Sequence, residues 1–418
     1  MDACEYVAEL ARSASAAAGE LAAADGAVRN AALCAAAVAL RSRAADLQAA
    51  NEKDLARSGE LGLSQAMVDR LRLTDERIEK MACALEQVAA QPDPVGRTIS
   101  ACNRPNGLRV EKRRVPIGVI ALVYESRPNV TSDAAALCLK SANACILRGG
   151  KEALHSNAAI GEAVRAGLRT AGVGPAAVQV VDRTDRDVVP ALARARGQID
   201  LIVPRGGTGL IRAVTDAATI PVIKHFDGVC HVYVHAAAEA DMAEAIALNA
   251  KCQRPGVCNA METLLIDAAV AETFLPRVTA AMRAAGVELR GCPRCRQIVP
   301  DLAAATEGDW TTEYLDLILA VRIVDDLDAA VAHINSYGSG HTDAIVTGSL
   351  AAAEAFQRRV DAASVMVNAS TRFSDGGEYG LGAEVGISTD KLHARGPMGA
   401  EDLTTYKWIV TGRGHLRS

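Results

Sequence analysis

The spacing of apolar residues changes character along the 418-residue chain. Over residues 1–90, Ala, Leu, Arg and Glu recur with the period of amphipathic helices. Ser64 precedes one apolar-periodic stretch, so we predict that it caps a helix. The helical pattern breaks at Pro92 and Pro94. We therefore expect a helical segment over roughly the first 90 residues.

A hairpin signal follows. The segment 102–115 alternates in residue type and carries Asn106-Gly107, a dipeptide typical of a tight β-turn. Little of this segment can face a core, because it contains these charged residues: Arg109, Glu111, Lys112, Arg113 and Arg114. We predict a projecting β-ribbon.

After Pro116, short apolar runs alternate with helical stretches. The first series of predicted strands reads GVIALVY, ACIL, VQVV, DLIV and PVIK, with helices at SDAAALCLKSA, 152–170, 185–196 and 208–217. The second series reads HVYV, TLLI, LILAVRIV, DAIVT and SVMVN, with helices from Glu239, Ala268, Asp326 and Leu350. Strands separated by helices of this length indicate parallel, doubly wound sheets. The fold class is therefore α/β, with two α/β domains.

The composition predicts a large aliphatic core and argues against nucleic-acid binding. Half of the residues are hydrophobic but only 3% are aromatic, so a large core must be built from Ala, Val, Leu and Ile. The formal net charge of −5 offers no basic excess for nucleic-acid phosphates. We therefore expect no nucleic-acid partner.

The start of the chain and its cysteines indicate a cytoplasmic protein. Asp2, Glu5 and Glu9 replace the basic region of a secretory signal. The apolar run 31–40 is too short to span a bilayer, so we expect no membrane partner. Eleven cysteines, an odd number spread over a long chain, favour free thiols in a reducing compartment.

Two glycine-containing turns follow predicted strands. Arg148-Gly149-Gly150-Lys151 comes directly after ACIL, where parallel sheets bind ligands, and its two cations suit a phosphate. It does not match the spacing of a Walker P-loop, and an ordinary strand-to-helix turn explains it equally well.

The second turn, Arg205-Gly206-Gly207, lies between DLIV and the next helix. Glycines there can expose the amides of a helix N-terminus to an anion. The dinucleotide fingerprint is not met, because Arg212 stands at the position of its last glycine.

One cysteine stands out. Cys258 follows Pro255 and Gly256 in a turn just before the predicted strand TLLI, and Arg254 is placed to hold a thiolate. Cys252 lies nearby but lacks the flanking turn. Most cysteines are buried apolar residues, yet this setting favours Cys258 as a nucleophile.

Other reactive side chains carry weaker signals. Cys292 and Cys295 form a lone C-x-x-C without a second pair of zinc ligands, so we predict a surface loop with free thiols and no metal. His225 and His341 stand beside predicted strands and can act as acid or base, although solvated turn histidines are the commoner case.

Several long segments carry a family resemblance. They are YESRPNVTSDAAALCLKSANACILRGGK, PVIKHFDGVCHVYV, QRPGVCNAMETLL, VAHINSYGSGHTDAIVT and STRFSDGGEYGLGAEVGISTDKLHARGPMGAEDLTTYKWIV. Together they resemble the gamma-glutamyl phosphate reductases, or glutamate-5-semialdehyde dehydrogenases, of the aldehyde dehydrogenase superfamily. The resemblance runs from about Asn106 to the C-terminus and is weakest over the first ninety residues. Gly256 stands where Ser is common.

The resemblance implies an aldehyde dehydrogenase-like architecture. It comprises a Rossmann-like NADPH-binding domain over residues 1–228, with 103–119 as an oligomerisation hairpin, and a catalytic domain over 229–370 that carries Cys258. Residues 371–418 are expected to return to the cofactor domain, where KWIVTG should pair near the hairpin. A homo-oligomer is implied, with dimer and tetramer both open.

The implied reaction is the NADPH-dependent reduction of L-glutamyl 5-phosphate to L-glutamate 5-semialdehyde and phosphate, the second step of proline biosynthesis from glutamate. Cys258 would attack the acyl carbon, displace phosphate and form a thioester. The Cys258 N–H and a side-chain amide would hold the oxyanion. Ser126 occupies the aligned place for that amide, but Asn129 is the nearest amide, and we assign it the role.

The remaining site assignments also follow from the resemblance. Oxidising relatives hydrolyse the thioester with a Glu, which His225 replaces here; a reductase benefits from the loss of this base. Arg148 and Lys151 favour NADPH over NADH, while Glu152 opposes it. Arg254 and His341 are expected to contact the substrate. A separate glutamate 5-kinase is the implied supplier of substrate.

Three other functions remain open from the residues alone. A hydrolytic aldehyde dehydrogenase would need the missing Glu. A cysteine hydrolase would use Cys258 with His225 or His341 and no nucleotide. A catalytically inactive, oligomeric binding protein would have no need of the Cys258 turn.

Overall fold

The computed structural model describes residues 2–417. The chain divides into two compact units. Unit 1 takes in the chain up to residue 224, residues 380–386 and the chain from 398 onward, and unit 2 takes in 225–379 and 387–397. The division falls between 224 and 225 rather than at 228, and residues 371–379 lie in unit 2. The assignment of the units to cofactor and catalysis stays a prediction.

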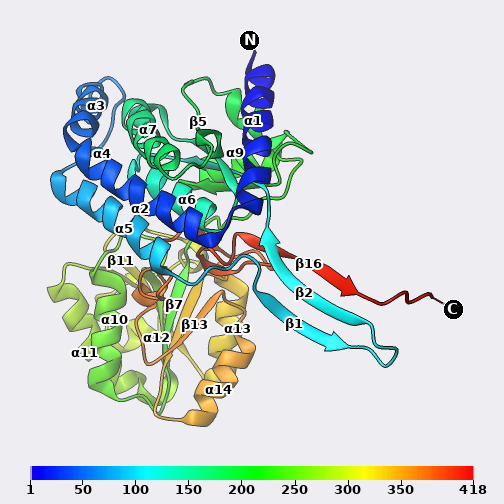
Figure 1. The fold of residues 1–418 in the computed structure, drawn as a ribbon. Coiled ribbons are helices and arrows are strands. Elements are labelled where there is room, and N and C mark those ends of the chain that lie inside the picture. Colours follow the sequence, from blue (N-terminus) through cyan, green and yellow to red (C-terminus); the bar gives the residue numbers. More distant parts are fainter. Residues whose placement is uncertain (1, 418) are drawn as a thin grey trace. The chain divides into compact units, whose positions relative to one another are not determined.

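Five helices open unit 1, as the periodicity predicts (Figure 1). They are α1 (Ala3–Ala23), α2 (Gly26–Ser42), α3 (Ala44–Ala56), α4 (Gln65–Leu71) and α5 (Asp75–Ala90). Asp2 and Glu5 form a reciprocal capping box at the start of α1. The predicted cap at Ser64 is confirmed, since its hydroxyl accepts the Met67 N–H.

The parallel sheet of unit 1 has the order β5-β4-β3-β6. Its strands are β3 (Val119–Tyr124), β4 (Ala144–Arg148), β5 (Val178–Val180) and β6 (Leu201–Arg205). The associated helices are α6 (Asn129–Lys140), η1 (Lys151–Ala153), α7 (Leu154–Thr170), η2 (Pro175–Ala177), α8 (Val188–Ala193) and α9 (Thr208–Ala217). The apolar core on one face joins α1, α8 and α9 to the sheet.

Two predictions for unit 1 are wrong in detail. PVIK is not a strand: Val222 makes only an isolated bridge to Ile202. Pro221 has no N–H to donate to a ladder, which limits pairing there. The helix expected over 185–196 shortens to α8, because the chain turns back at Arg196 and Gly197 (φ 79°).

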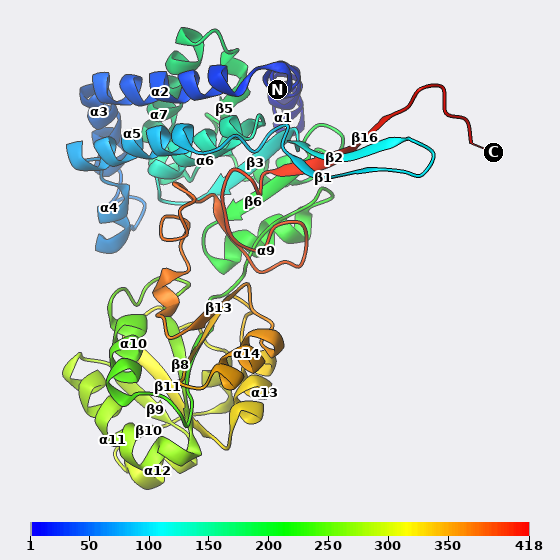
Figure 2. The ribbon, with the colours of Figure 1, turned by 60° about the horizontal axis from the view of Figure 1, so that its bottom comes forward.

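The predicted ribbon is confirmed. β1 (Thr98–Asn103) and β2 (Arg109–Pro116) form an antiparallel hairpin, and the C-terminal β16 (Thr404–Thr411) pairs along β2. The three strands extend from the rest of unit 1 (Figure 2). Glu111 is buried at 8% exposure despite its charge, because Arg109 and Arg113 both pair with it.

Unit 2 is built on a seven-stranded sheet in the order β10-β9-β11-β8-β7-β12-β13, in which each neighbouring pair is parallel. The strands are β7 (Cys230–Val234), β8 (Met261–Asp267), β9 (Glu288–Gly291), β10 (Ala303–Ala304), β11 (Ile318–Val324), β12 (Thr342–Val346) and β13 (Ser364–Val367). The helices are α10 (Ala240–Cys252), α11 (Ala268–Ala284), α12 (Pro293–Ile298), η3 (Glu307–Thr311), α13 (Leu327–Tyr337), α14 (Leu350–Arg359) and η4 (Thr371–Phe373).

Alternate side chains of these strands pack into two separate hydrophobic cores, one on each face of the sheet. Val232 and Leu264 face a core shared with α10 and α11, whereas Tyr233 and Leu265 face one shared with α13 and α14. This period of two is what a sheet covered by helices on both faces requires. The pair β14 (Gly386–Ser388) and β15 (Gly396–Met398) forms a separate two-stranded sheet.

The eleven cysteines are free thiols among the described residues, as expected. The predicted surface loop at Cys292 and Cys295 is wrong: Cys292 caps α12, Cys295 lies within it, and both thiols are buried against the core. Across residues 2–417, no helix combines the length and apolarity needed to cross a bilayer.

Candidate active site

The amino edge of the seven-stranded sheet gathers three reactive side chains. Cys258 comes just before β8, His225 before β7 and His341 before β12. Parallel strands begin at a common edge, and β7 lies between β8 and β12 in the sheet. One donor atom from each of the three side chains lies within 4.8 Å of the other two.

Gly228 allows the segment before β7 to approach Cys258 closely. A Cβ at Gly228 would stand 2.0 Å from the Cys258 carbonyl oxygen, so a larger residue cannot occupy this position. The Gly228 N–H donates to Glu313 Oε1 at 2.9 Å. Burial raises the pKa of the Glu313 carboxyl. The backbone at Gly228 thus packs directly against the backbone of Cys258.

The two histidines differ in setting. His225 is half-buried, and its Nδ1 lies 2.8 Å from the Ile387 carbonyl oxygen. A carbonyl can only accept, so Nδ1 carries the proton and neutral His225 keeps its lone pair on Nε2. His341 is fully buried, with Nδ1 2.9 Å from the Thr342 hydroxyl. The expectation of a solvated turn histidine is wrong for His341.

A second thiol lies behind the turn. Cys230 Sγ donates to the Cys258 carbonyl oxygen at 3.1 Å and lies 3.8 Å from His341 Nδ1. Burial raises the pKa of the Cys230 thiol well above its ordinary value. Cys230 therefore stays protonated and acts as a packing group, whereas Cys258 is half-exposed at the edge.

Two guanidinium groups flank the Cys258 turn. Arg254 is exposed, and Arg372, in η4, donates from Nε to Gln253 Oε1 at 2.8 Å and from Nη1 to Asn259 Oδ1. Within the described chain neither arginine pairs with a carboxylate, and both positive charges stay available to an anion. Burial lowers the pKa of Arg372, and the charge of Arg254 adds to that effect. The sequence did not predict a role for Arg372, although this residue lies in the family-like segment that begins STRFSDGG.

A buried ion pair closes the base of the Cys258 segment. Lys251 Nζ lies 2.6 Å from Glu262 Oε2, and both side chains are 0% exposed. Lys251 lies in the last turn of α10 and Glu262 lies in β8, so the pair ties together the two ends of the segment that carries Cys258. The other Glu262 oxygen accepts the Leu315 N–H at 3.3 Å. No pattern in the sequence predicted the ion pair between Lys251 and Glu262.

In unit 1, the predicted cofactor turns meet at the carboxyl edge of the sheet. β3 pairs with β4 on one side and β6 on the other, so Arg148 lies opposite Val123 and Arg205 lies opposite Tyr124. The chain proceeds from β3 to β4 and β5 in one direction, and β6 is added on the other side. Such a reversal is where open parallel sheets bind ligands.

Internal contacts occupy part of these turns. A Cβ at Gly150 would lie 2.0 Å from a Glu152 oxygen, so the Glu152 side chain would have to shift to admit a larger residue. Arg205 pairs with Glu384 at 2.9 Å. Around Gly207 there is open space for a Cβ, but its N–H donates to Glu125. Lys151 is exposed.

Arg148 and Gly149 complete the first turn. Arg148 Nη1 donates to the Gly149 carbonyl oxygen at 3.1 Å, and burial lowers the pKa of Arg148. A Cβ at Gly149 would lie 1.9 Å from the Asn157 amide nitrogen, so this glycine also serves packing. Lys151 and Gly207 are thus the most open of the predicted cofactor contacts.

The turn after β3 contains both candidates for the second oxyanion donor. Ser126 has a positive φ of 43°, and its N–H and hydroxyl both donate to Glu152 Oε1, at 2.6 and 2.8 Å. Asn129 is exposed, and its amide donates to Asp133 at 2.9 Å. An amide has two N–H bonds, so Asn129 keeps one for another acceptor.

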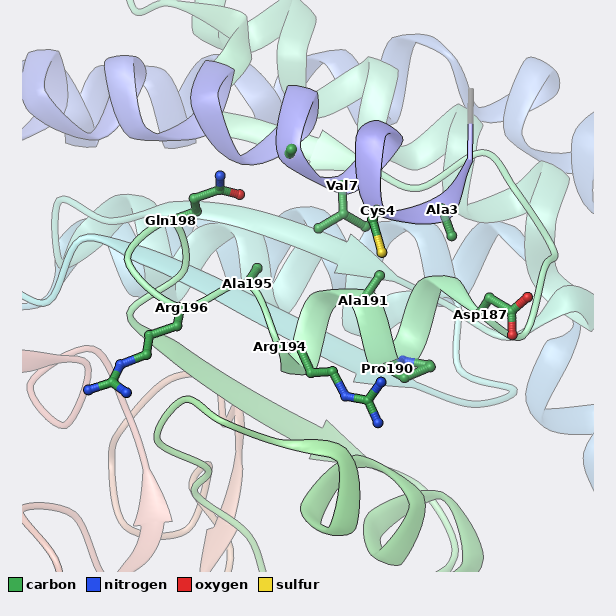
Figure 3. Close-up of a pocket in the computed structure, with 11 residues that line it drawn as sticks. Ala3, Cys4, Val7, Asp187, Pro190, Ala191, Arg194, Ala195, Arg196 and Gln198 are labelled. Atoms are coloured by element: carbon green, nitrogen blue, oxygen red, sulfur yellow. The ribbon is translucent and has the colours of Figure 1, made fainter.

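A cavity of about 500 Å³ in unit 1 lies elsewhere. Figure 3 shows it between the start of α1, with Cys4 and Val7, and the α8 region, with Pro190 and Ala191. None of the predicted site residues lines it. A second cavity, of about 320 Å³ in unit 2, borders the turn before His341.

Known proteins resemble this chain over most of its length. The model of the aldehyde dehydrogenase family matches residues 3–291. A gamma-glutamyl phosphate reductase of Moorella thermoacetica is 54% identical over 389 residues, 93% of each chain. The crystal structure of a gamma-glutamyl phosphate reductase from Thermotoga maritima is 45% identical, with a TM-score of 0.96 over 98% of this chain and 99% of that one.

More distant structures share the fold. The glyceraldehyde-3-phosphate dehydrogenase GapN of Methanocaldococcus jannaschii, solved in complex with NADP, is 13% identical, with a TM-score of 0.69 over 98% of this chain and 95% of that one. The α/β architecture fits the fold of these relatives, and the sequence match covers most of the chain. This chain belongs to the aldehyde dehydrogenase family.

Proposed function

We propose that this protein reduces L-glutamyl 5-phosphate to L-glutamate 5-semialdehyde and phosphate with NADPH, through a thioester on Cys258. The observation that carries the proposal is the half-exposed Cys258 thiol between two imidazoles and two guanidinium groups that lack a carboxylate partner in the described chain. The relatives named gamma-glutamyl phosphate reductase support the choice of substrate.

The first step is attack of the Cys258 thiolate on the acyl carbon. His225 lies beside the thiol, and its Nε2, which keeps the lone pair, accepts the thiol proton in this proposal. The bond from sulfur to carbon forms, and the bond from carbon to the phosphate oxygen breaks. Arg254 and Arg372 hold the substrate's anionic groups, because a guanidinium binds phosphate and carboxylate with paired N–H donors.

The tetrahedral oxyanion needs donors set in advance. We assign the Cys258 N–H as one and the second Asn129 N–H as the other; each such donor lowers the barrier by about 3 kcal/mol. His341, fixed in the buried wall of the site, contacts the substrate in this proposal.

Hydride added to the thioester carbon gives a hemithioacetal oxyanion, which collapses to the aldehyde as the carbon–sulfur bond breaks and the His225 imidazolium returns its proton to the thiolate. The bound nicotinamide cofactor would supply that hydride. Its phosphates suit the turns Arg148–Lys151 and Arg205–Gly207, which flank the end of β3 at the reversal of strand order. Lys151 is exposed and available to a 2′-phosphate, and we assign it the preference for NADPH. Gly207 is the N-cap residue of α9 and leaves room for a pyrophosphate.

His225 stands where hydrolytic relatives have a general base. Its imidazole is directed by the Ile387 carbonyl, which holds the proton on Nδ1. Once Nε2 has taken the thiol proton, the imidazolium has no lone pair to activate water, so the thioester is protected until reduction.

A coupled assay tests the proposal. Glutamate, ATP and a glutamate 5-kinase generate the labile substrate in place, NADPH consumption is followed optically, and the semialdehyde is trapped with o-aminobenzaldehyde. We expect NADPH loss and trapped aldehyde in equal amounts, both dependent on the kinase. Aldehyde formation without NADPH use, or no turnover beside an active control enzyme, would refute the assignment.

A second candidate is a cysteine hydrolase. The approach of two imidazoles to Cys258 within 4.8 Å favours it, since hydrolases pair thiol and imidazole in this way. It would release glutamate from glutamyl phosphate or from thioesters without any nucleotide. Glutamate release at equal rates with and without NADPH would select this function over the reductase.

Further parts of the proposal concern assembly. We propose that the ribbon joins subunits of a homo-oligomer, because β16 carries exposed apolar side chains at Tyr406, Trp408 and Val410. Replacing Trp408 by Lys should then lower the molar mass seen in sedimentation. The reaction sits in proline biosynthesis in the cytoplasm, and a separate glutamate 5-kinase supplies the substrate.

A further inference from the structure

We propose that Cys258, His225 and His341 form a binding site for a thiophilic divalent cation, Zn²⁺ above all, and that its occupation reversibly blocks the nucleophile. The site differs from a resident catalytic metal centre, because the proposed reaction needs the thiolate free. The binding itself depends only on the three side chains and not on the proposed function.

The donor set fits Zn²⁺. One thiolate and two imidazoles are ligands that zinc prefers, and a water completes a tetrahedron. Tetrahedral bonds of about 2.0–2.3 Å place ligand atoms about 3.3–3.7 Å apart. The donor atoms here already lie within 4.8 Å of one another, so capture requires movements of about 1 Å. Cys258 and His225 are half-exposed and can make them.

Neighbouring groups orient the imidazoles as outer partners of a metal site do. The Ile387 carbonyl holds the His225 proton on Nδ1, which leaves Nε2 for a cation. The Thr342 hydroxyl lies 2.9 Å from His341 Nδ1. His341 is fixed in the buried wall, so it provides a rigid ligand toward which the other two can close.

The charges around the site predict reversible rather than permanent binding. No carboxylate belongs to the donor set, and Arg254 and Arg372 oppose a cation nearby. Glu313 offsets part of this, since its carboxylate lies near enough to interact with His341. Binding forms a bond from sulfur to zinc and releases the thiol proton, with no change of oxidation state.

Another thiol pair is the main competitor. Cys292 and Cys295 have their sulfurs 3.5 Å apart, but both are buried in the core and Cys295 donates to the Val321 carbonyl. Two buried thiols without further ligands make a poor zinc site. Variants at this pair and at Cys252, which lies outside the triad, provide matched controls.

Co²⁺ titration of the purified full chain, in buffer free of thiols and phosphate, tests binding directly. We expect one equivalent to give tetrahedral visible bands and a near-ultraviolet thiolate band. Cys258→Ser should abolish the thiolate band. His225→Gln should weaken Co²⁺ binding about tenfold or more, as should His341→Gln. Cys252→Ser and Cys292→Ser should bind as the parent does.

Inhibition of the enzymatic turnover by Zn²⁺ provides a second test of the site. Zn²⁺ should inhibit NADPH-dependent turnover of the parent and of Cys252→Ser, and a chelator should restore it. A thiolate band that survives in Cys258→Ser or disappears in Cys292→Ser would overturn the proposal. So would Co²⁺ affinity that is unchanged in His225→Gln, because the cation would then bind a lone thiolate. Failure of the reductase assay alone would leave the Co²⁺ result standing.

Discussion

Removing Lys251 should destabilise the protein in a pH-dependent way. Lys251 and Glu262 form an ion pair with both side chains 0% exposed, beneath the Cys258 segment. Burial raises the pKa of Glu262 from its ordinary 4.5 to about 7 even with Lys251 beside it, and burial lowers the pKa of Lys251. In Lys251→Met, the unpaired Glu262 must therefore take a proton on folding at neutral pH.

The cost follows from linkage. The native pKa of Glu262 lies above its unfolded value, so the penalty is absent below pH 4.5 and grows as the pH rises toward the native value. At pH 5 the parent and Lys251→Met both fold with Glu262 protonated, so they bear the same cost. At pH 8 the variant must protonate a carboxyl of pKa 4.5, which costs 3.5 pH units at 1.36 kcal/mol each, about 4.8 kcal/mol. The parent ionises Glu262 above its native pKa of about 7, so its own cost stops near 2.5 pH units, about 3.4 kcal/mol. The variant's extra loss at pH 8 is therefore about 1.4 kcal/mol.

Urea unfolding at pH 8 and pH 5 provides the assay. The chain has two tryptophans, and a Trp408→Phe background leaves Trp310, which is buried in unit 2, as the reporter. We expect Lys251→Met to lose about 1.4 kcal/mol more unfolding free energy at pH 8 than at pH 5. Equal losses at both pH values, or a larger loss at pH 5, would refute the reasoning.

A paired variant separates charge from packing. Lys251→Met with Glu262→Gln contains no buried ion, so most of the stability should return and the dependence on pH should disappear. The alkylation rate of Cys258 by iodoacetamide reports on the segment above the pair. We expect a slower rate in Lys251→Met under folded conditions, because a loosened segment no longer holds the thiol beside His225 and His341.

Four further predictions follow from the same structure. Cys258→Ser should abolish NADPH oxidation while leaving NADPH binding intact, because an unactivated hydroxyl is a poor nucleophile; normal turnover would move the role to Cys252. Lys151→Ala should weaken NADPH binding by roughly 1.5–3 kcal/mol and NADH binding less, and equal losses in fluorescence titrations would assign Lys151 a different role. His225→Glu should raise glutamate release from the thioester about 100-fold if the carboxylate reaches water, and glutamate at the parent level would contradict the position of His225. Burial lowers the pKa of His333 from 6.5 to about 3, so its stabilising effect is present above pH 6.5 and is lost as the pH falls; His333→Gln should remove about 2 kcal/mol of the parent's loss in unfolding free energy between pH 7 and pH 5.

Local signals in the sequence determined most of the elements. Period-two and period-3.6 spacing located the principal strands and helices of both units, and Asn106-Gly107 located the hairpin. The turn before β8 indicated Cys258 as a candidate nucleophile, because the residues next to Cys258 in sequence also surround it in space. Such features depend on a few consecutive residues, so the sequence alone contains them.

The tertiary structure alone decided which distant residues meet. His225, Cys258 and His341 converge because β7 lies between β8 and β12, an order that no local pattern encodes. The same edge brings Arg372 to Gln253 and Asn259, and seals Lys251 against Glu262. Burial follows packing rather than residue type, which is why Cys295 and His341 lie inside although a surface loop and a solvated turn were expected. The sequence specified the elements and pointed to Cys258, and the strand order assembled the groups that surround this cysteine.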